Sequence, residues 1–294
     1  MKRIVAFVFI LSVFFTAFVM RSFAEDASEY KIEQTDGGYR FIKNGVVLSE
    51  SDNLDSLIDG LCALKEPIYF DRVNYGGELT VDGDAVFCGS LNAKGIYVNY
   101  GARLKLQNAE IRLDEGITVY GGECTLDGGS IISKNCAVKL NTFSTSQFTM
   151  LGGVLQSEGG QAAIISECGR TVLTGGEIVN EYGPAIINKA DLHIGNVKMC
   201  AIGYEIITEN AIWLYSEDEG FDGAIRIKLN KLFEKGTKET VVYNAYAELA
   251  DRLTVYDKNG MAEAAVFQDG VICVYKPFEA KFIFKDKTQK TVYF

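Results

Sequence analysis

The chain has 294 residues, of which 48% are hydrophobic and 23% charged, with 30 glycines and only 3 prolines. A disordered or collagen-like chain is excluded, because it would carry more proline and fewer aromatics than the 15 Tyr and 18 Phe present here. The formal net charge of −10 disfavours a nucleic-acid partner, which would bind a basic surface. Many glycines among aromatic and β-branched residues indicate strands joined by tight turns.

Residues 1–24 have the pattern of an export signal. Two basic residues near the start precede an uncharged apolar run from Ile4 to Met20, and Ser22 and Ala24 place small residues before a cleavage site at Glu25. We expect cleavage there and a secreted or cell-surface protein with no stable membrane insertion. An uncleaved signal anchor is the alternative, because the apolar run is at the short end of the lengths that span a membrane.

Residues 25–66 are expected to form a hairpin followed by a capping helix. The segment YKIEQTDGGYRFIKNG from Tyr30 alternates around a glycine turn, as hairpins do. Residues Asn53–Leu64 place leucine and isoleucine at helical spacing, and Pro67 follows. We interpret this helix as a plug for the open end of the repeat that comes next.

Two markers recur along residues 67–215 with one period. The first is a glycine turn, as in TLDGGSI at Thr125 and TMLGGVL at Thr149. The second is a short apolar strand, whose first apolar residues recur with a mean step of about 22 residues. These residues are Ile96, Ile117, Val138, Ile164, Ile186 and Ile206. A period of this length without helical spacing predicts an all-β fold, a right-handed parallel β-helix.

In such a coil, inward apolar residues form ladders from one turn to the next. We expect the pairs Ile96/Val98, Ile117/Val119 and Val138/Leu140 to point inward, whereas the double isoleucines of later coils leave the inward phase open. The polar run NTFSTSQ from Asn141 is expected to be a protruding loop.

Residues 216–294 are expected to form a small C-terminal β-rich domain after the acidic run Ser216–Glu219. Strands are predicted at IRIKL from Ile225, ETVVYNA from Glu239, LTVYD from Leu253 and VICVYK from Val271, with a short helix at Ala245–Leu249 and a hairpin turn at Tyr256–Gly260.

Several of these motifs resemble exported surface proteins of Gram-positive bacteria. They are TMLGGVL, the stretch GGEIVNEYGPAIINKADL from Gly175, LTVYDKNG and YKPFEAKFIF, and the likeness extends over roughly residues 50 to 294. In those proteins pectate-lyase-like coils are followed by a small β module and often by internalin-type β-grasp repeats. The resemblance implies an extracellular surface role, with release or wall association left open.

Enzymes that degrade pectin share this fold, so the fold alone does not decide whether the chain is an enzyme. The catalytic motifs must decide. The hydrolase motifs N-T-D, D-D and G-H-G are absent, and the R-I-K match at Arg226–Lys228 is interpreted as chance. The acids and bases that a lyase would need do not recur at one period, so they are interpreted as solvated turn residues. These are Asp82, Asp84, Asp114, Glu115, Arg103 and Arg112. The single histidine, His193, has apolar neighbours and is interpreted as a surface or satisfied side chain.

The seven cysteines lie at wide spacing without a CxxC pair, which disfavours a zinc site and a disulfide framework. Most are expected to be buried small apolar side chains. We assign no catalytic residue, metal or cofactor.

Binding is the favoured function. We expect an extracellular, monomeric, non-enzymatic scaffold that contacts polysaccharide or another surface protein, with Tyr97, Tyr100 and Tyr120 as candidate glycan contacts. The offset from Tyr97 to Tyr120 is slightly longer than one step of the repeat, so the two should lie diagonally on one face. The alternatives are a polysaccharide lyase or hydrolase, a structural spacer, and tyrosines that only cover the sheet.

Overall fold

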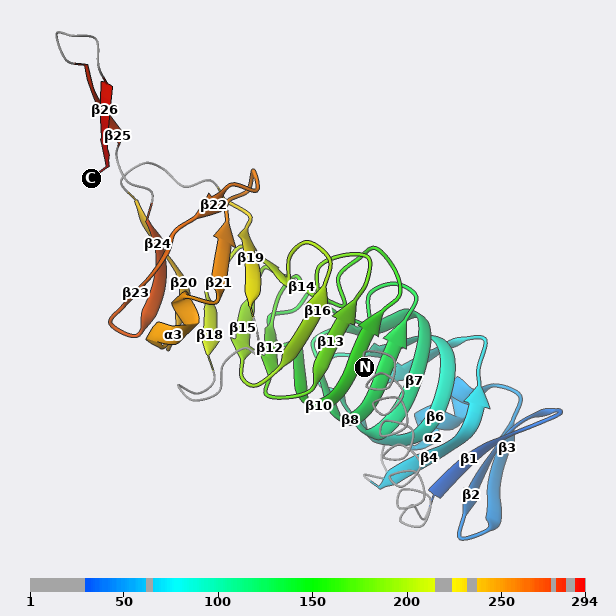
Figure 1. The fold of residues 1–294 in the computed structure, drawn as a ribbon. Helices are drawn as coiled ribbons and strands as arrows, with labels where there is room; N and C mark the ends of the chain where they lie inside the picture. The colour runs from blue at the N-terminus through cyan, green and yellow to red at the C-terminus, as the bar shows by residue number, and fades with distance from the viewer. Residues whose placement is uncertain are drawn as a thin grey trace, which may run out of the picture.

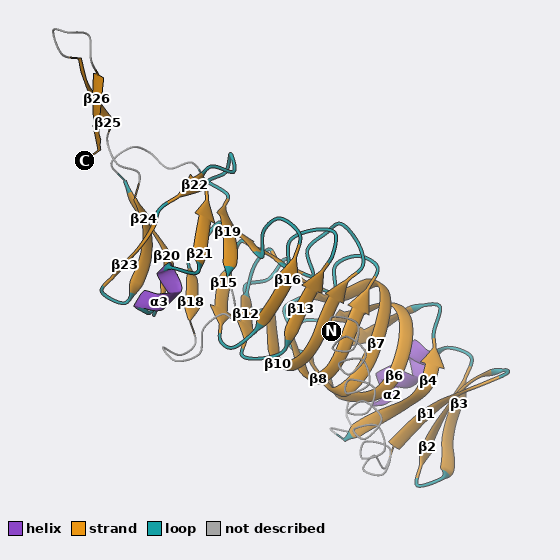
Figure 2. Cartoon of the chain, viewed as in Figure 1, coloured by secondary structure: helices purple, strands orange, loops and turns teal. Residues whose placement is uncertain are grey.

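The computed structural model describes residues 30–61, 66–214, 224–231 and 237–275, and the backbone of 279–283 and 289–293. It is mostly β, with a parallel β-solenoid of about seven turns (Figures 1 and 2). The predicted export signal, residues 1–24, and the acidic run Ser216–Glu219 lie outside the described residues. Among the described residues, neither helix is long and apolar enough to cross a bilayer.

Each turn of the solenoid carries strands on three sheets, which we name face 1, face 2 and face 3 in the order in which the chain meets them. Strands β6 (Asp84–Val98) and β7 (Arg103–Val119) each run along all three faces and pair in parallel over their whole length. Strands β4 (Pro67–Asn74), β8 (Glu123–Ser133) and β10 (Gln147–Ser157) each cover faces 1 and 2.

Shorter strands complete the faces. Face 1 continues through β12 (Arg170–Leu173), β15 (Asp191–Ile194) and β18 (Ile212–Leu214). Face 2 continues through β13 (Glu177–Asn180) and β16 (Lys198–Ala201). Face 3 starts with β5 (Glu78–Val81) and continues after β7 through β9 (Val138–Leu140), β11 (Ile164–Ser166), β14 (Ile186–Asn188) and β17 (Ile206–Thr208).

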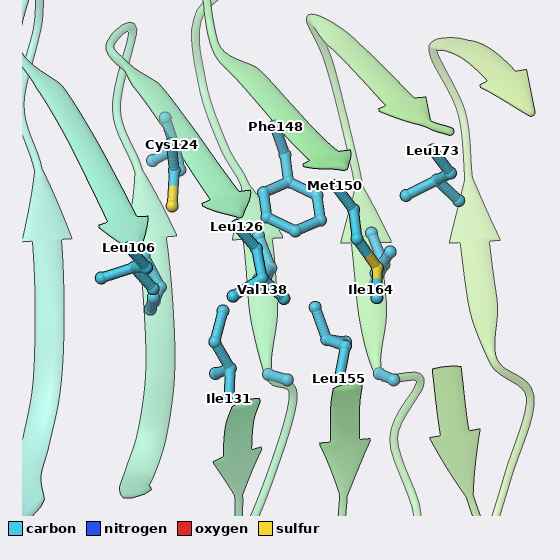
Figure 3. Close-up of a cluster of buried hydrophobic side chains, with 14 of the residues drawn as sticks. Leu106, Cys124, Leu126, Ile131, Val138, Phe148, Met150, Leu155, Ile164 and Leu173 are labelled. Atoms are coloured by element: carbon cyan, nitrogen blue, oxygen red, sulfur yellow. The ribbon is translucent and has the colours of Figure 1, made fainter. Parts of the chain in front are cut away.

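The predicted inward ladders are confirmed. Ile117 and Val119 lie between Ile96/Val98 and Val138/Leu140 in register, and all six side chains are buried. In the double isoleucines the first residue points inward, as at Ile164, and the second is half-buried on the outside. Phe148, Met150, Leu155 and Leu173 fill the interior between neighbouring coils (Figure 3).

Glycine is required where the coils stack closely at a corner. Gly129 has φ +75°, and a Cβ added there would lie 2.2 Å from the carbonyl oxygen of Ala109 in the preceding coil. Gly153 repeats this one coil later, with φ +92° and 2.6 Å to the oxygen of Gly129. The glycine turn recurs because any side chain would be strained and would push the coils apart.

Buried polar side chains close other corners, which the sequence pattern did not indicate. Asn188 ends a face 3 strand, and its Nδ2 donates to the carbonyl oxygen of Ala190 (2.8 Å) and to Thr208 Oγ1 (3.2 Å) in the next coil. Ser133, Ser157 and Asn180 hold equivalent buried positions at the end of face 2. These bonds satisfy the backbone where the chain turns out of the ladder.

The capping role predicted for the helix was wrong. Helix α2 is described over Leu54–Leu61, while residues 62–64 of the predicted helix lie outside the described residues, and Asp55 Oδ1 fixes α2 to β5 by accepting a hydrogen bond from the Thr80 amide (2.6 Å). The first coil is extended by strands instead, because β1 (Tyr30–Thr35) pairs in parallel with β4. The predicted hairpin is confirmed as β1 with β2 (Gly38–Lys43), and β3 (Val46–Ser51) adds an outer strand. Sheet extension thus takes the place of a helical plug.

The parallel sheet continues from the coils into the predicted C-terminal domain. Strand β19 (Ile225–Leu229) pairs in parallel with β17 and with β21 (Leu253–Tyr256), and β20 (Lys238–Tyr243) pairs in parallel with β18. Antiparallel pairing then begins, with β24 (Val271–Tyr275) on β20, β23 (Ala265–Gln268) on β24 and β22 (Ala262–Glu263) on β21.

The predicted C-terminal strands and the hairpin turn at Tyr256–Gly260 are confirmed. The short helix is α3 (Ala247–Ala250). Strands β25 (Glu279–Ile283) and β26 (Gln289–Tyr293) pair with each other.

Candidate functional site

The tyrosines predicted from the sequence lie on and next to face 3. Tyr97 is half-buried on the outside of β6, in register with Thr118, and the Tyr120 amide donates to the carbonyl oxygen of Val98 (2.8 Å). The Tyr97 and Tyr120 rings stack with centroids 6.1 Å apart and an angle of 18°. The expected diagonal placement is therefore confirmed. One face of each ring is therefore turned toward the other ring.

Tyr100 has the most open ring of the three. It is 69% exposed, and its ring makes an edge contact with Phe143, centroids 5.8 Å apart. A methyl group added to Gly121 would lie 2.6 Å from Cδ2 of Tyr100, so the ring packs directly over the glycine backbone. A ring supported on one side and open to solvent on the other is the geometry on which an apolar sugar face can stack.

Phe143 was not anticipated as a site residue. It lies in the loop predicted to protrude from Asn141, in which residues 142–145 are exposed. Ser146 anchors this loop, because its Oγ accepts a hydrogen bond from the Gly121 amide (2.8 Å) and lies 3.1 Å from the carbonyl oxygen of Val119, to which it donates. Phe143 is thus held beside Tyr100.

Tyr97, Tyr100, Tyr120 and Phe143 form a group that we call the tyrosine cluster. Charged side chains lie next to Tyr97 in this cluster. The Tyr97 hydroxyl donates to Glu115 (3.4 Å), and Lys94 pairs with Glu78 (2.6 Å) and Glu115 (3.3 Å). Burial, followed by Glu78 and Glu115, raises the pKa of Tyr97. The phenol therefore stays neutral and acts as a hydrogen-bond donor.

A groove of about 370 Å³ lies where face 2 turns toward face 3 in the first coils. Its lining includes Asn92, Lys94, Arg112 and the ion pair of Lys134 with Asp114 (2.6 Å). Asn92 and Arg112 are in register on neighbouring coils, and the Asn92 Oδ1 is buried without a donor among the described residues. No sequence motif indicates this groove, because its lining residues come from different coils. The signal that could have found it is the alignment of residues one coil apart, such as Asn92 and Arg112.

The prediction that the acids and bases of a lyase do not stack was wrong in part. Asp84, Arg103 and Glu123 align on face 1, with Arg103 3.9 Å from Asp84 and 3.4 Å from Glu123. The face 1 step from Asp84 to Arg103 is shorter than the mean period of the repeat, which is why the alignment was missed. These groups pair with one another across coils.

Arg226 of the R-I-K tripeptide has a structural partner. Glu205 is only 6% exposed, and its carboxylate accepts from Nε (3.1 Å), Nη2 (2.5 Å) and the backbone amide of Arg226 (2.7 Å). The guanidinium therefore clamps two neighbouring coils of face 3. This agrees with a chance match to the catalytic motif.

His193 is half-buried on the outside of β15 and stacks on Trp213, with ring centroids 6.2 Å apart. Burial, then Arg170, lowers the pKa of His193, so the imidazole is neutral at pH 7. Within the described residues it makes no hydrogen bond to a hydroxyl or carboxylate. The residues that the structure describes also contain no group of three or more potential metal ligands.

The described cysteines are mostly buried, as expected. Four of the six are buried, Cys168 is intermediate and Cys200 is exposed. Burial raises the pKa of Cys124 and Cys136 to about 12.

Among the described cysteines we therefore expect Cys200 to react first with a thiol reagent at pH 8, while Cys124 and Cys136 stay unmodified until the chain unfolds. Peptide mapping after a short alkylation checks this, with Cys200→Ser as the control that removes the fastest site. Early labelling of Cys124 would contradict the buried inward position of its side chain.

No family model, curated protein or solved structure matches this chain. The likeness to exported surface proteins thus rests on motifs and on the parallel solenoid.

Proposed function

We propose that the chain is an exported, non-enzymatic β-solenoid scaffold that contacts a polysaccharide, with Tyr100 as the main stacking ring. The right-handed sense of the coil and cleavage before Glu25 are parts of this proposal. The observation that carries it is the Tyr100 ring, 69% exposed and held between Gly121 and Phe143. Exposed aromatic rings that are held rigidly lose little entropy when a ligand packs on them.

The role of Tyr97 and Tyr120 is secondary in this proposal. Their rings stack on each other, so one face of each ring is turned toward the other ring and away from a ligand. A hydrolase is disfavoured because Arg226 of the R-I-K tripeptide pairs with Glu205, and a lyase is disfavoured because Arg103, one of the two bases considered for it, pairs with Asp84 and Glu123.

The test is retention of residues 25–294 on a panel of immobilised polysaccharides, with a reducing-sugar assay alongside. Tyr100→Ala should weaken binding about ten-fold, equivalent to about 1.4 kcal/mol, and leave the thermal midpoint unchanged. Tyr182→Ala is the matched control, because Tyr182 is also an exposed tyrosine (65%) but lies on another coil.

Three outcomes would overturn the proposal. Equal retention of the parent and Tyr100→Ala would remove Tyr100 from the site. Released reducing ends would favour the enzyme. A parent that binds neither polysaccharide nor any surface protein would favour the structural spacer.

A further inference from the structure

The groove at the turn from face 2 to face 3 contains a cation that has no ion pair among the described residues. Of its three basic side chains, Lys94 is held by Glu78 and Glu115, and Lys134 is held by Asp114. Arg112 pairs with no carboxylate in the described part of the chain. Its guanidinium is the group in this groove that remains available to an anion.

The remaining acid of the groove, Glu158, forms no ion pair with Arg112 in the part of the chain that the structure describes. Arg112 is in register with Ile132, and Ile132 with Gln156, so Glu158 belongs to the second coil beyond Arg112. Neighbouring parallel strands are about 4.8 Å apart, so the two backbones lie roughly 10 Å apart. Arg112 and Glu158 therefore lie on opposite sides of the intervening coil, and no ion pair joins them within the described residues.

The chemistry around Arg112 suits an oxyanion on a hydroxylated molecule. A guanidinium presents a planar fork of donors that matches carboxylate, sulfate and phosphate groups. Asn92, in register beside it, and Asn74 add amide groups that can bond to hydroxyls, and the volume of about 370 Å³ lies within the range of small-ligand sites.

The groove is also connected to the tyrosine cluster. Lys94 lines the groove and pairs with Glu115, which accepts the hydrogen bond of Tyr97. A polysaccharide bound in the groove can therefore continue past Tyr97 on face 3 to Tyr120 and Tyr100 where that face ends.

We propose that this groove binds one acidic sugar unit of the polysaccharide, with its oxyanion on Arg112. The inference rests on the proposed function and makes it specific, because it names the charged unit that the scaffold selects. It also accounts for binding by a protein of net negative charge, since the contact is one local pair and not a basic surface.

The experiment is a titration of the mature chain, followed by NMR, with four probes. Methyl glucuronide, glucose 6-sulfate and glucose 6-phosphate carry the oxyanion on a sugar, and methyl glucoside is the neutral reference. We expect at least one charged probe to bind ten-fold or more tightly than the reference. Arg112→Ala should abolish that preference, Arg112→Lys should keep part of it, and added salt should weaken it.

Arg170→Ala is the matched control, an exposed arginine without a described ion pair that lies on face 1 outside the groove. An equal loss in both variants would reveal non-specific charge attraction and overturn the proposal. Inorganic phosphate or sulfate binding as well as the charged sugars would overturn the sugar part. If Tyr100→Ala weakens polysaccharide retention while Arg112→Ala does not, the scaffold function stands and this inference fails.

Discussion

Replacing Val119 with Asp is expected to lower the free energy of unfolding by on the order of 4 kcal/mol or more. Val119 is fully buried and lies in register between Val98 and Leu140 of the neighbouring coils. An Asp there would bring a carboxyl group into an apolar ladder that offers it no donor. Whether the group ionises or takes up a proton, its hydration is lost without replacement, so both forms are unfavourable.

The matched control is Thr118→Asp in the same strand. Thr118 is half-buried on the outside, and its register partner in the next coil is Lys139. An Asp at this position stays hydrated and faces a lysine, so the denaturation midpoint should change little. Chemical denaturation followed by circular dichroism compares the two variants. Equal stabilities would show that the inward phase of face 3 has been assigned to the wrong residues.

The interior could be predicted from the sequence because its constraints repeat. Alternation at Ile117 and Val119 recurs at Ile96 and Val98, and a parallel stack is the arrangement that lets both ladders stay buried. Corner glycines such as Gly129 can also be predicted from the sequence, because a positive φ and close contact with the preceding coil leave no room for a side chain.

The outer surface could not be predicted in the same way, because the coil length differs from face to face. Between β6 and β7 the sequence step is shortest on face 1, from Asp84 to Arg103. It is one position longer on face 2, from Asn92 to Arg112, and one longer again on face 3, from Ile96 to Ile117. A single mean period therefore misaligns outward side chains, which hid both the ion pairs of face 1 and the groove.

The ends of the solenoid were misjudged for a different reason. The apolar spacing around Leu54 and Ile58 correctly indicates a buried helical face, and both residues are buried. The spacing does not reveal that β1 already extends the sheet beside β4, which makes a helical plug unnecessary. Pairing between segments so distant along the chain leaves no local pattern in the sequence.

Replacing Arg226 with Ala is expected to destabilise the protein by about 3 kcal/mol. The carboxylate of Glu205 is only 6% exposed. The substitution removes the two hydrogen bonds that it accepts from the guanidinium and keeps the one from the backbone amide of residue 226. It also removes the bond from Nη2 to the carbonyl oxygen of Ala201 (3.2 Å). Both losses fall where β17 and β19 join the regular coils to the C-terminal strands.

The double variant Glu205→Gln/Arg226→Ala separates a buried charge from lost packing. A neutral amide at position 205 has no charge to compensate, so the double variant should be more stable than Arg226→Ala alone. Lys228→Ala is the control in the same strand. Among the described residues Lys228 makes a cation–π contact with Tyr204 (5.3 Å) and no ion pair, so its loss should cost well under about 1 kcal/mol. If Arg226→Ala keeps the parental thermal midpoint, the clamp carries no stability. If it also abolishes a polysaccharide-cleaving activity, Arg226 is a catalytic residue and the R-I-K tripeptide is a true motif.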